Sequence, residues 1–261
     1  MNILSSIAIP YFFILGLIIG SFLNATEYRL FRGQRIGRSK KGGAERSRCP
    51  HCKIQLPVKD LFPVVSFVLL RGRCRSCKKK ISVQYPLIEL VAGVVLALAA
   101  YRFGWSVQAF VTALFGALLL FIFLYDVKHE LILDKITVPA IAIVFVVSWW
   151  MGYIPVTSLL AGAGVGGGFF LLQFVVSKGK WIGGGDIRLG VLMGVMLGVS
   201  GTLAALLLSY VGGAIIALGL ICAKKATVKS HIPFGTFLTA ATYAILLYGN
   251  EIISWYLHLL S

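Results

Sequence analysis

Two aspartates stand out in a chain that is poor in acidic residues. Only nine of the 261 residues are Asp or Glu. Asp126 ends one apolar stretch, in FLYDVKHE, and Asp186 begins another, in WIGGGDIRLG. Two carboxylates that lie close together do not both ionise, so one can act as a base on water while the other protonates a leaving group. The pair predicts acid–base cleavage of a peptide bond, with Asp186 as the base because a helix N-terminus favours its ionised form.

The segment before the second aspartate consists of Gly183, Gly184 and Gly185. Glycines permit unusual backbone conformations and leave space, so we interpret these three as a loop that a substrate backbone can approach. Taken alone, GGGD is equally well explained as a turn followed by a helix cap. The presence of Asp126 at the same membrane face favours the catalytic interpretation.

Other acidic residues receive different interpretations. Asp134 is best explained as a cap of the helix that starts near Ile136. Glu27 and Glu89 lie at or near membrane depth, where ionisable groups usually have a function, and we expect them to pair with Arg29 or to line the site.

Four cysteines have the spacing of a zinc site. Cys49 and Cys52 form one C-x2-C pair, Cys74 and Cys77 form a second, and 21 residues separate the pairs. Two such pairs turn four sulfurs toward one tetrahedral ion, which leaves no open position for catalysis, so we predict structural zinc. Two disulfides are the alternative, and a cytoplasmic location argues against them.

The composition indicates a membrane protein, because 58% of the residues are hydrophobic and only 13% are charged. Apolar runs long enough to cross a bilayer recur along the chain, and one shorter run has the same character. We therefore predict an all-α polytopic membrane protein with about eight transmembrane helices. The predicted spans are 7–23, 87–105, 107–125, 136–153, 157–176, 187–199 (the short one), 202–222 and 236–257.

The basic residues fix the topology of these spans. Of the 25 Lys and Arg residues, 16 lie between Arg29 and Lys80, eight lie in alternate loops, and only Arg102 lies on the other side. The positive-inside rule then places residues 29–85 in the cytoplasm and both termini outside. The first segment has no basic residue before it, so we interpret it as a retained helix rather than a signal peptide. The net charge of +16 needs no nucleic acid to explain it; part of it should lie against anionic lipid.

The expected domains are a first transmembrane helix (1–30), a small basic cytoplasmic zinc-binding domain (31–85) and a transmembrane peptidase bundle (86–261). Residues 31–48 read as a mobile loop, and 61–70 as domain core or an interfacial segment.

A glycine-rich run occupies residues 161–168. No strand precedes it, so a nucleotide cradle is disfavoured. Gly162 with Gly166, and Gly164 with Gly168, instead form small-xxx-small pairs that let membrane helices approach closely.

Several motifs follow one another along nearly the whole chain: GSFLN from Gly20 to Asn24, YRL from Tyr28 to Leu30, the two CxxC pairs, RGRC from Arg71, YPLIEL from Tyr85, Asp126 at a helix end, GxGD ending at Asp186, and IPFG from Ile232. Together, and in this order, they resemble the bacterial type IV prepilin peptidases. The sequence departs from the family pattern at Ile132-Leu133-Asp134, where Leu-Pro-Asp is usual, at Ala25-Thr26-Glu27 and at IPFGTF.

The resemblance implies a GxGD aspartyl protease of the inner membrane, with Asp126 and Asp186 as catalytic residues and the four cysteines as zinc ligands. It implies cleavage of a short basic leader from prepilin-like partners, followed by N-methylation of the new N-terminus with S-adenosylmethionine. We expect methylation to depend on residues near the polar end of the first helix, namely Asn24, Glu27 and Arg29.

Three alternatives remain at this stage. The chain could be a peptidase without methyltransferase activity. A presenilin-like peptidase is suggested by the Tyr-Asp and GxGD pair, but the Pro-Ala-Leu motif of that group is absent. A non-catalytic membrane scaffold with a basic zinc domain is the third, although this domain lacks the interleaved aromatic residues that single-stranded nucleic acids require.

Overall fold

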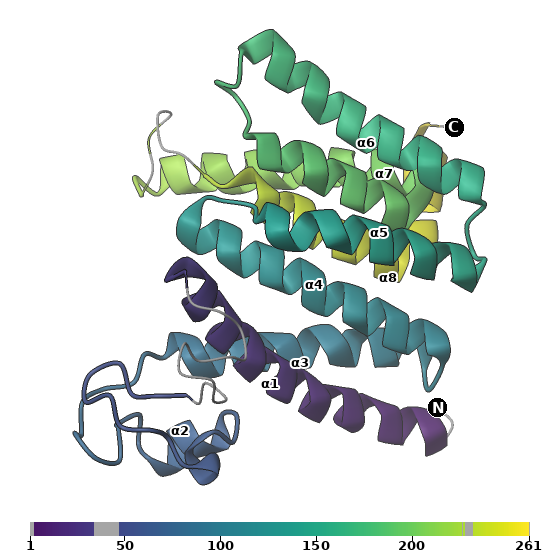
Figure 1. Cartoon of the computed structure of the whole chain (residues 1–261). Coiled ribbons are helices and arrows are strands. Elements are labelled where there is room, and N and C mark those ends of the chain that lie inside the picture. The colour runs from purple at the N-terminus through teal and green to yellow at the C-terminus, as the bar shows by residue number, and fades with distance from the viewer. Residues whose placement is uncertain (1–2, 34–46, 226, 228–231, 261) are drawn as a thin grey trace. The chain divides into compact units, whose positions relative to one another are not determined.

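The computed structural model describes residues 3–33, 47–225, 227 and 232–260, and long helices dominate these ranges (Figure 1). Six of the described helices are long and apolar enough to cross a membrane. This confirms the predicted all-α polytopic class. In chain order the elements are α1 (Ile3–Phe31), η1 (Val58–Asp60), α2 (Val65–Leu69), α3 (Gln84–Phe103), α4 (Val107–His129), α5 (Asp134–Met151), α6 (Val156–Ser177), α7 (Gly184–Cys222) and α8 (Phe234–Leu260).

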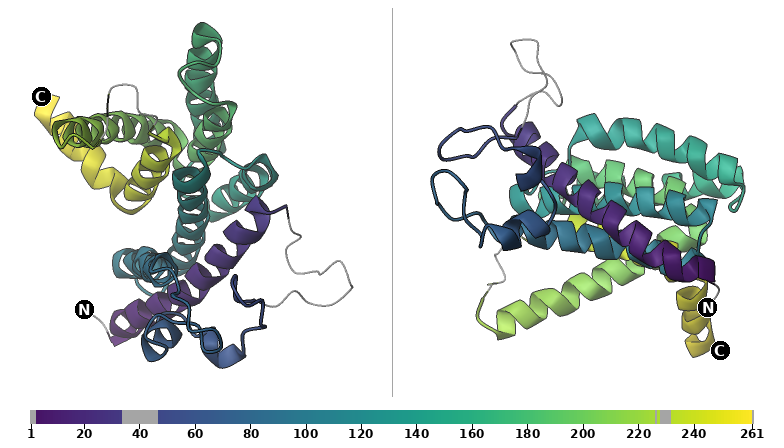
Figure 2. Two further views of the ribbon diagram at one scale, coloured as in Figure 1. Left: turned by 90° about the vertical axis from the view of Figure 1, so that its left-hand side faces the viewer. Right: turned by 90° about the horizontal axis from the view of Figure 1, so that it is seen from below.

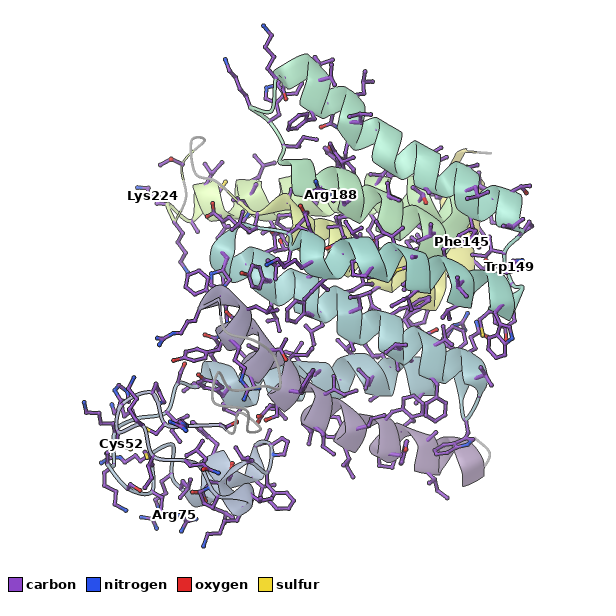
Figure 3. The ribbon with its side chains drawn as sticks, viewed as in Figure 1. Cys52, Arg75, Phe145, Trp149, Arg188 and Lys224 are labelled. Atoms are coloured by element: carbon purple, nitrogen blue, oxygen red, sulfur yellow. The ribbon has the colours of Figure 1, made fainter. Side chains whose placement is uncertain are left out.

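Helix α7 contains two of the predicted spans. A straight helix of its 39 residues would be about 58 Å long, twice the thickness of a hydrocarbon core. The helix is broken at Gly198, whose φ of 67° and ψ of −170° are not helical. Arg188 near the start of α7 and Lys224 just beyond its end lie at the same end of the bundle, opposite Phe145 and Trp149 of α5 (Figure 3). With α7 counted as two arms and α8 included, the described helices match the eight predicted spans.

The chain divides into two compact units, residues 1–117 and 118–261. The division into 1–30, 31–85 and 86–261 made from the sequence remains a prediction.

The first unit is built on the pairing of α1 with α3, which lie side by side in all views (Figures 1 and 2). Small side chains allow the two helices to come close, and larger ones fill the remaining space. The ring of Phe12 lies 4.6 Å from that of Phe110 at the start of α4, tilted by 50°. The buried core residues of this unit are Ala8, Phe12, Leu96, Ala99, Ala100, Ala109, Ala113 and Ala117.

The second unit depends on the contact between α6 and α7, and the glycine-rich run of α6 mediates it. A Cβ on Gly166 would stand 2.3 Å from the carbonyl oxygen of Gly190, and one on Gly162 would stand 2.6 Å from Gly198. The packing interpretation is therefore confirmed for this pair. It is wrong for Gly164 and Gly168, which have no such neighbour within 4 Å because they lie on another face of the helix.

The segment at 61–70 contains the short helix α2, which has no buried residue. Its apolar side chains are exposed, including Phe62, Val65, Val68 and Leu69. An interfacial role therefore describes it better than a domain core. Most of the basic loop predicted at 31–48 lies outside the described residues.

Candidate functional site

The four cysteines of the first unit come together as the sequence predicted. Their sulfur atoms all lie within 4.8 Å of one another, and the sulfurs of Cys49 and Cys77 are 3.9 Å apart. Thiolates bound tetrahedrally at about 2.3 Å from one zinc ion are about 3.8 Å apart. The arrangement therefore fits a four-cysteine zinc ion, with sulfur positions close to those that a tetrahedral ion requires.

The two cysteine pairs form equivalent turns. In the first, the N–H of Lys53 donates to Cys49 O and the N–H of Cys49 donates to Ile54 O, both at 3.0 Å. In the second, the N–H of Lys78 donates to Cys74 O at 3.0 Å. Lys53 and Lys78 both have left-handed backbones, with φ of 61° and 58°. This conformation reverses the chain after each pair and turns both sulfurs inward.

Two thiols of the cluster are shifted in opposite directions. Burial disfavours the Cys49 thiolate, but backbone N–H groups of Cys52 and His51 and the neighbouring thiols lower the pKa of Cys49 from 9.0 to about 7. The backbone at Ile54 favours the Cys52 thiolate, but burial and the other three thiols raise the pKa of Cys52 to about 11. Beside the cluster, Arg75 donates three hydrogen bonds to Asp60, at 2.7, 3.1 and 3.2 Å. This fork-shaped contact joins η1 to the second cysteine pair, because Arg75 lies between Cys74 and Cys77 in the chain.

Asp126 lies one turn before the end of α4, and its side chain is buried, with 5% of the residue exposed. The backbone N–H of Thr236 is a hydrogen-bond partner of its carboxylate. Its second oxygen, Oδ2, is buried and has no partner among the described residues. Oδ2 faces Gly235, where a Cβ would stand only 2.7 Å away. An unpaired carboxylate oxygen at this position is available to a water molecule or a substrate.

Asp186 occupies the first turn of α7 and is also buried, with 8% of the residue exposed. Its Oδ2 accepts a hydrogen bond of 3.1 Å from the N–H of Gly183. Asp186 therefore makes the cap contact that was the alternative explanation of GGGD. The other oxygen is not used in that contact. Ile132 contacts both Gly185, which precedes Asp186, and Gly235, which faces Asp126, so the structure brings the two residues that the sequence singled out into one region.

The three glycines before Asp186 do not share one role. A Cβ on Gly184 would meet nothing within 4 Å, and one on Gly183 would meet only the Asp186 carboxylate and the N–H of Gly185 at about 4 Å. At Gly185 the space is already filled, because the Cβ of Ile132 lies 2.8 Å from the position a side chain would take. Substrate approach thus remains an expectation for the first two glycines, whereas Gly185 is required for packing.

Some residues of this region were missed by sequence reasoning. Asp134 is the first residue of α5 and forms an ion pair with Arg188, so it is not the N-cap that was expected. Ile132 lies beside both Gly185 and Gly235. Ile132, Asp134 and Gly235 all belong to motifs noted in the sequence. Asp134 was expected to cap a helix, whereas no physical role could be assigned to Ile132 or Gly235 without their neighbours.

The polar end of α1, in the first unit, is more buried than the sequence suggested. Asn24 and Glu27 are both more than nine-tenths buried, and the Asn24 amide donates to the carbonyl of Tyr85 at 3.2 Å. The hydroxyl of Thr26 is buried there without a partner among the described residues. Arg29 is partly exposed. This helix end therefore offers one unsatisfied polar atom to a ligand.

Glu89 of α3 has a contact that the sequence did not predict. Its carboxylate accepts a 2.7 Å hydrogen bond from the N–H of Val64, which has a left-handed φ of 58°. A left-handed backbone is uncommon for a β-branched residue. Glu89 thus holds the start of α2 against α3.

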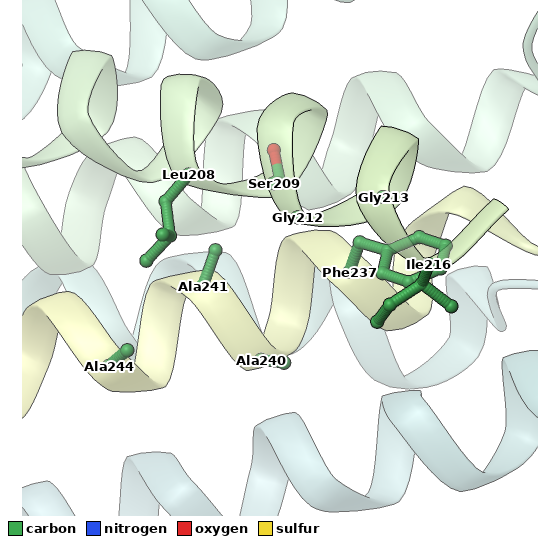
Figure 4. A pocket seen from close by; sticks show the side chains of 9 residues that line it. All are labelled: Leu208, Ser209, Gly212, Gly213, Ile216, Phe237, Ala240, Ala241 and Ala244. Atoms are coloured by element: carbon green, nitrogen blue, oxygen red, sulfur yellow. The ribbon is translucent and has the colours of Figure 1, made fainter. Parts of the chain in front are cut away.

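A cavity of about 250 Å³ lies between the second arm of α7 and α8 (Figure 4). It is lined mainly by small and apolar side chains, and neither aspartate lines it. The lining residues are Leu208, Ser209, Gly212, Gly213, Ile216, Phe237, Ala240, Ala241 and Ala244.

Comparisons with known proteins agree with this arrangement. The bacterial peptidase A24 N-terminal domain matches residues 14–103, and the type IV leader peptidase family matches residues 113–218. The prepilin leader peptidase/N-methyltransferase of Neisseria gonorrhoeae is 30% identical, over 98% of this chain and 97% of that protein. The proteins of the same name from Bacillus subtilis and Stutzerimonas stutzeri are each 33% identical, over 94% of this chain and 96% and 92% of their own lengths. No solved structure matches significantly. With both halves matched and relatives aligned over nearly their full length, the chain belongs to the type IV leader peptidase family.

Proposed function

We propose that this protein is a membrane aspartyl endopeptidase that removes the short basic leader from type IV prepilin-like proteins. The observation that carries the proposal is the pair of buried carboxylates of Asp126 and Asp186, supplied by α4 and α7, beside two glycines that a single side chain, Ile132, contacts. Family membership and the names of the relatives agree with it.

The geometry supports a division of labour between the two aspartates. The N-terminus of α7 and the N–H of Gly183 stabilise negative charge on Asp186, so Asp186 is the base. It removes a proton from water as the water oxygen attacks the scissile carbonyl carbon. Asp126 carries the proton that the pair retains and delivers it to the amide nitrogen as the C–N bond breaks. The open space at Gly184 gives the substrate backbone a route to this pair.

The site should face the cytoplasm. Arg188 and Lys224 lie at the same end of the second unit as the start of α7, whereas Trp149 lies at the opposite end (Figure 3). Basic residues mark the cytoplasmic side of membrane helices, and exposed tryptophans are common at both interfaces. The same rule, applied to the Lys and Arg residues of the sequence, would place both termini outside and residues 29–85 inside. The partners would be the lipid bilayer and a prepilin-like protein that presents its leader on the cytoplasmic side.

The cysteine cluster would hold one structural zinc ion. All four sulfurs would be ligands, which leaves no position for a catalytic water. A domain of about 50 residues buries too little surface to be stable alone, so zinc would supply part of its folding free energy.

Methylation of the new N-terminus is the second activity that we propose. S-adenosylmethionine would supply the methyl group as an electrophile to the amine that cleavage exposes. The residues expected to hold it are Asn24, Glu27 and Arg29, and the unsatisfied hydroxyl of Thr26 is compatible with a polar ligand at this helix end.

One experiment tests both activities. The purified protein is incubated with a pilin-like substrate and S-adenosylmethionine, and the products are identified by mass spectrometry. We expect a product that begins after the leader and carries one added methyl group. A cleaved but unmethylated product would establish a peptidase only, and an intact substrate at all enzyme concentrations would favour the non-catalytic scaffold.

A further inference from the structure

The loop between α4 and α5 contacts two glycines that lie beside the aspartates, Gly185 before Asp186 and Gly235 of α8. Its central residue, Ile132, packs on one side against Gly185, with its Cβ 2.8 Å and its Cδ1 3.4 Å from the position of a Cβ there. On the other side its Cδ1 lies 3.3 Å from the position of a Cβ on Gly235. Gly185 directly precedes Asp186, and Gly235 faces Oδ2 of Asp126. One side chain therefore contacts the immediate support of both carboxylates.

The two ends of this loop are bonded to α4 and α7, the helices that carry the aspartates. At its start the N–H of Glu130 donates to the carbonyl oxygen of Asp126 at 2.8 Å, and the φ of 52° at Glu130 turns the chain out of α4. At its end Asp134 forms an ion pair with Arg188, two residues after Asp186. The loop is thus attached to the α4 segment at one end and to the α7 segment at the other.

The residues of this loop differ in how far they are exposed to solvent. Leu131 is 59% exposed, whereas Ile132 is partly buried against the two glycines. The Asp134–Arg188 pair is about half exposed on both sides. Exposed ion pairs contribute little to stability. Ile132 should therefore contribute more to the arrangement than the ion pair does.

We propose that residues 130–134 form a clamp loop, and that Ile132 is a positioning residue that sets the distance and mutual orientation of the two aspartates. This rests on the proposed function, in which those aspartates cut the substrate. Ile132 contacts no reacting atom. It acts by filling the space between Gly185 and Gly235, so that the α7 segment and the α8 segment keep a fixed separation while substrate binds.

The first test compares Ile132→Ala with the matched control Leu131→Ala, using cleavage of a pilin-like substrate by purified enzyme. Displacement of a catalytic group by about 1 Å costs on the order of 100-fold. Shortening the Ile132 side chain should therefore lower kcat by about 10- to 100-fold, with KM changed by less than about threefold. Leu131→Ala should match the wild type, and Ile132→Val, which keeps the Cβ contact, should retain most activity. Thermal unfolding in detergent should be alike for all three variants.

The second test uses the close approach at Gly185. Gly185→Ala should be inactive because the new Cβ would meet the Cβ of Ile132 at 2.8 Å. Adding Ile132→Gly removes that atom and should restore part of the activity. The same Ile132→Gly change should not rescue Gly235→Ala, where the obstructing atom belongs to Asp126 itself. Rescue of one glycine variant and not of the other is not expected from a general loss of stability.

The outcomes separate the clamp from the proposed function. A wild-type kcat in Ile132→Ala, or no rescue of Gly185→Ala, would overturn the clamp loop. The proposed peptidase function would still hold if the Asp126→Asn and Asp186→Asn variants were inactive. Asp134→Asn should cost only about two- to fivefold, as an exposed ion pair does. If it is instead as damaging as Asp126→Asn, then Asp134 is a member of the dyad and the proposed function must be reassigned.

Discussion

Gly235→Ala tests the catalytic geometry with a single methyl group. The Cβ of the new alanine would stand 2.7 Å from Oδ2 of Asp126 and 3.1 Å from its Cγ. Ordinary van der Waals contact begins near 3.4 Å, so the carboxylate must move by about 0.7 Å or rotate away from its place. Alanine otherwise suits this position, because Gly235 lies in the first turn of α8 and alanine favours helix formation.

The size of the effect follows from that displacement. A misplacement of about 1 Å costs on the order of 100-fold in rate, so 0.7 Å should lower kcat by about 30- to 100-fold. At about 1.36 kcal/mol for each factor of ten, this is about 2 to 2.7 kcal/mol of lost transition-state stabilisation. The KM for substrate should change little, since the methyl group points at the carboxylate and not at the open side near Gly184.

The assay is steady-state cleavage of a pilin-like substrate in detergent or lipid nanodiscs, with thermal unfolding measured in parallel. The matched control is Gly164→Ala, another helical glycine whose added Cβ would meet nothing within 4 Å. We expect the control to be fully active and equally or more stable. Full activity of Gly235→Ala would refute the reasoning, because it would mean that Asp126 need not occupy the position seen here.

Four further outcomes are expected. Replacing Asp126 or Asp186 by Asn should abolish cleavage without unfolding the protein, since each carboxylate has its own part in moving the proton; near-wild-type cleavage by either variant would remove that residue from the dyad. The purified protein should contain about one zinc per chain, measured by elemental analysis. Stripping the metal should unfold mainly residues 49–77 while the helices persist, because metal binding by the four thiolates supplies that segment's folding free energy. A folded cysteine segment in metal-free protein would contradict this. The arginine partner of Asp60 lowers the pKa of that carboxyl below its ordinary 3.8, so the pair stabilises the folded domain above pH 3.8 and the contribution disappears as the pH falls through the lowered pKa. Hydrogen exchange should therefore show the same loss of backbone protection in Asp60→Asn, relative to the wild type, at pH 7 and at pH 5. A loss of protection that became larger in acid would contradict the lowered pKa. Substituting Asn24 or Glu27 by Ala should lower methylation of a pre-cleaved substrate more than it lowers proteolysis, and normal methylation by both variants would place the donor elsewhere.

Much of the membrane architecture was predictable from the sequence because each signal is local. A run of about 20 apolar residues is sufficient to predict a span, and the distribution of Lys and Arg is sufficient to predict an orientation. The two-arm nature of α7 was also predictable, since its apolar residues are too numerous for one crossing. The cysteine cluster followed from spacing alone, because the short C-x2-C turn leaves the paired sulfurs few arrangements.

The glycine-rich run of α6 shows where such reasoning stops. The small-xxx-small pattern identifies residues that can mediate close packing, but it fits two faces of the same helix equally well. Only the position of the partner helix decided that Gly162 and Gly166 pack against α7 and that Gly164 and Gly168 do not.

The candidate site divides in the same way. The sequence by itself determined which two aspartates are exceptional, because acidic residues are rare in this chain and these two lie at helix ends on one predicted face. Tertiary structure alone decided what surrounds them: that Asp134 pairs with Arg188, that Gly235 lies against Asp126, and that Ile132 fills the space between the glycine segments. The residues in contact are 53 to 109 positions apart in the chain, and no periodicity or spacing connects them. Their contacts exist only because helix packing brings the ends of α4, α7 and α8 together.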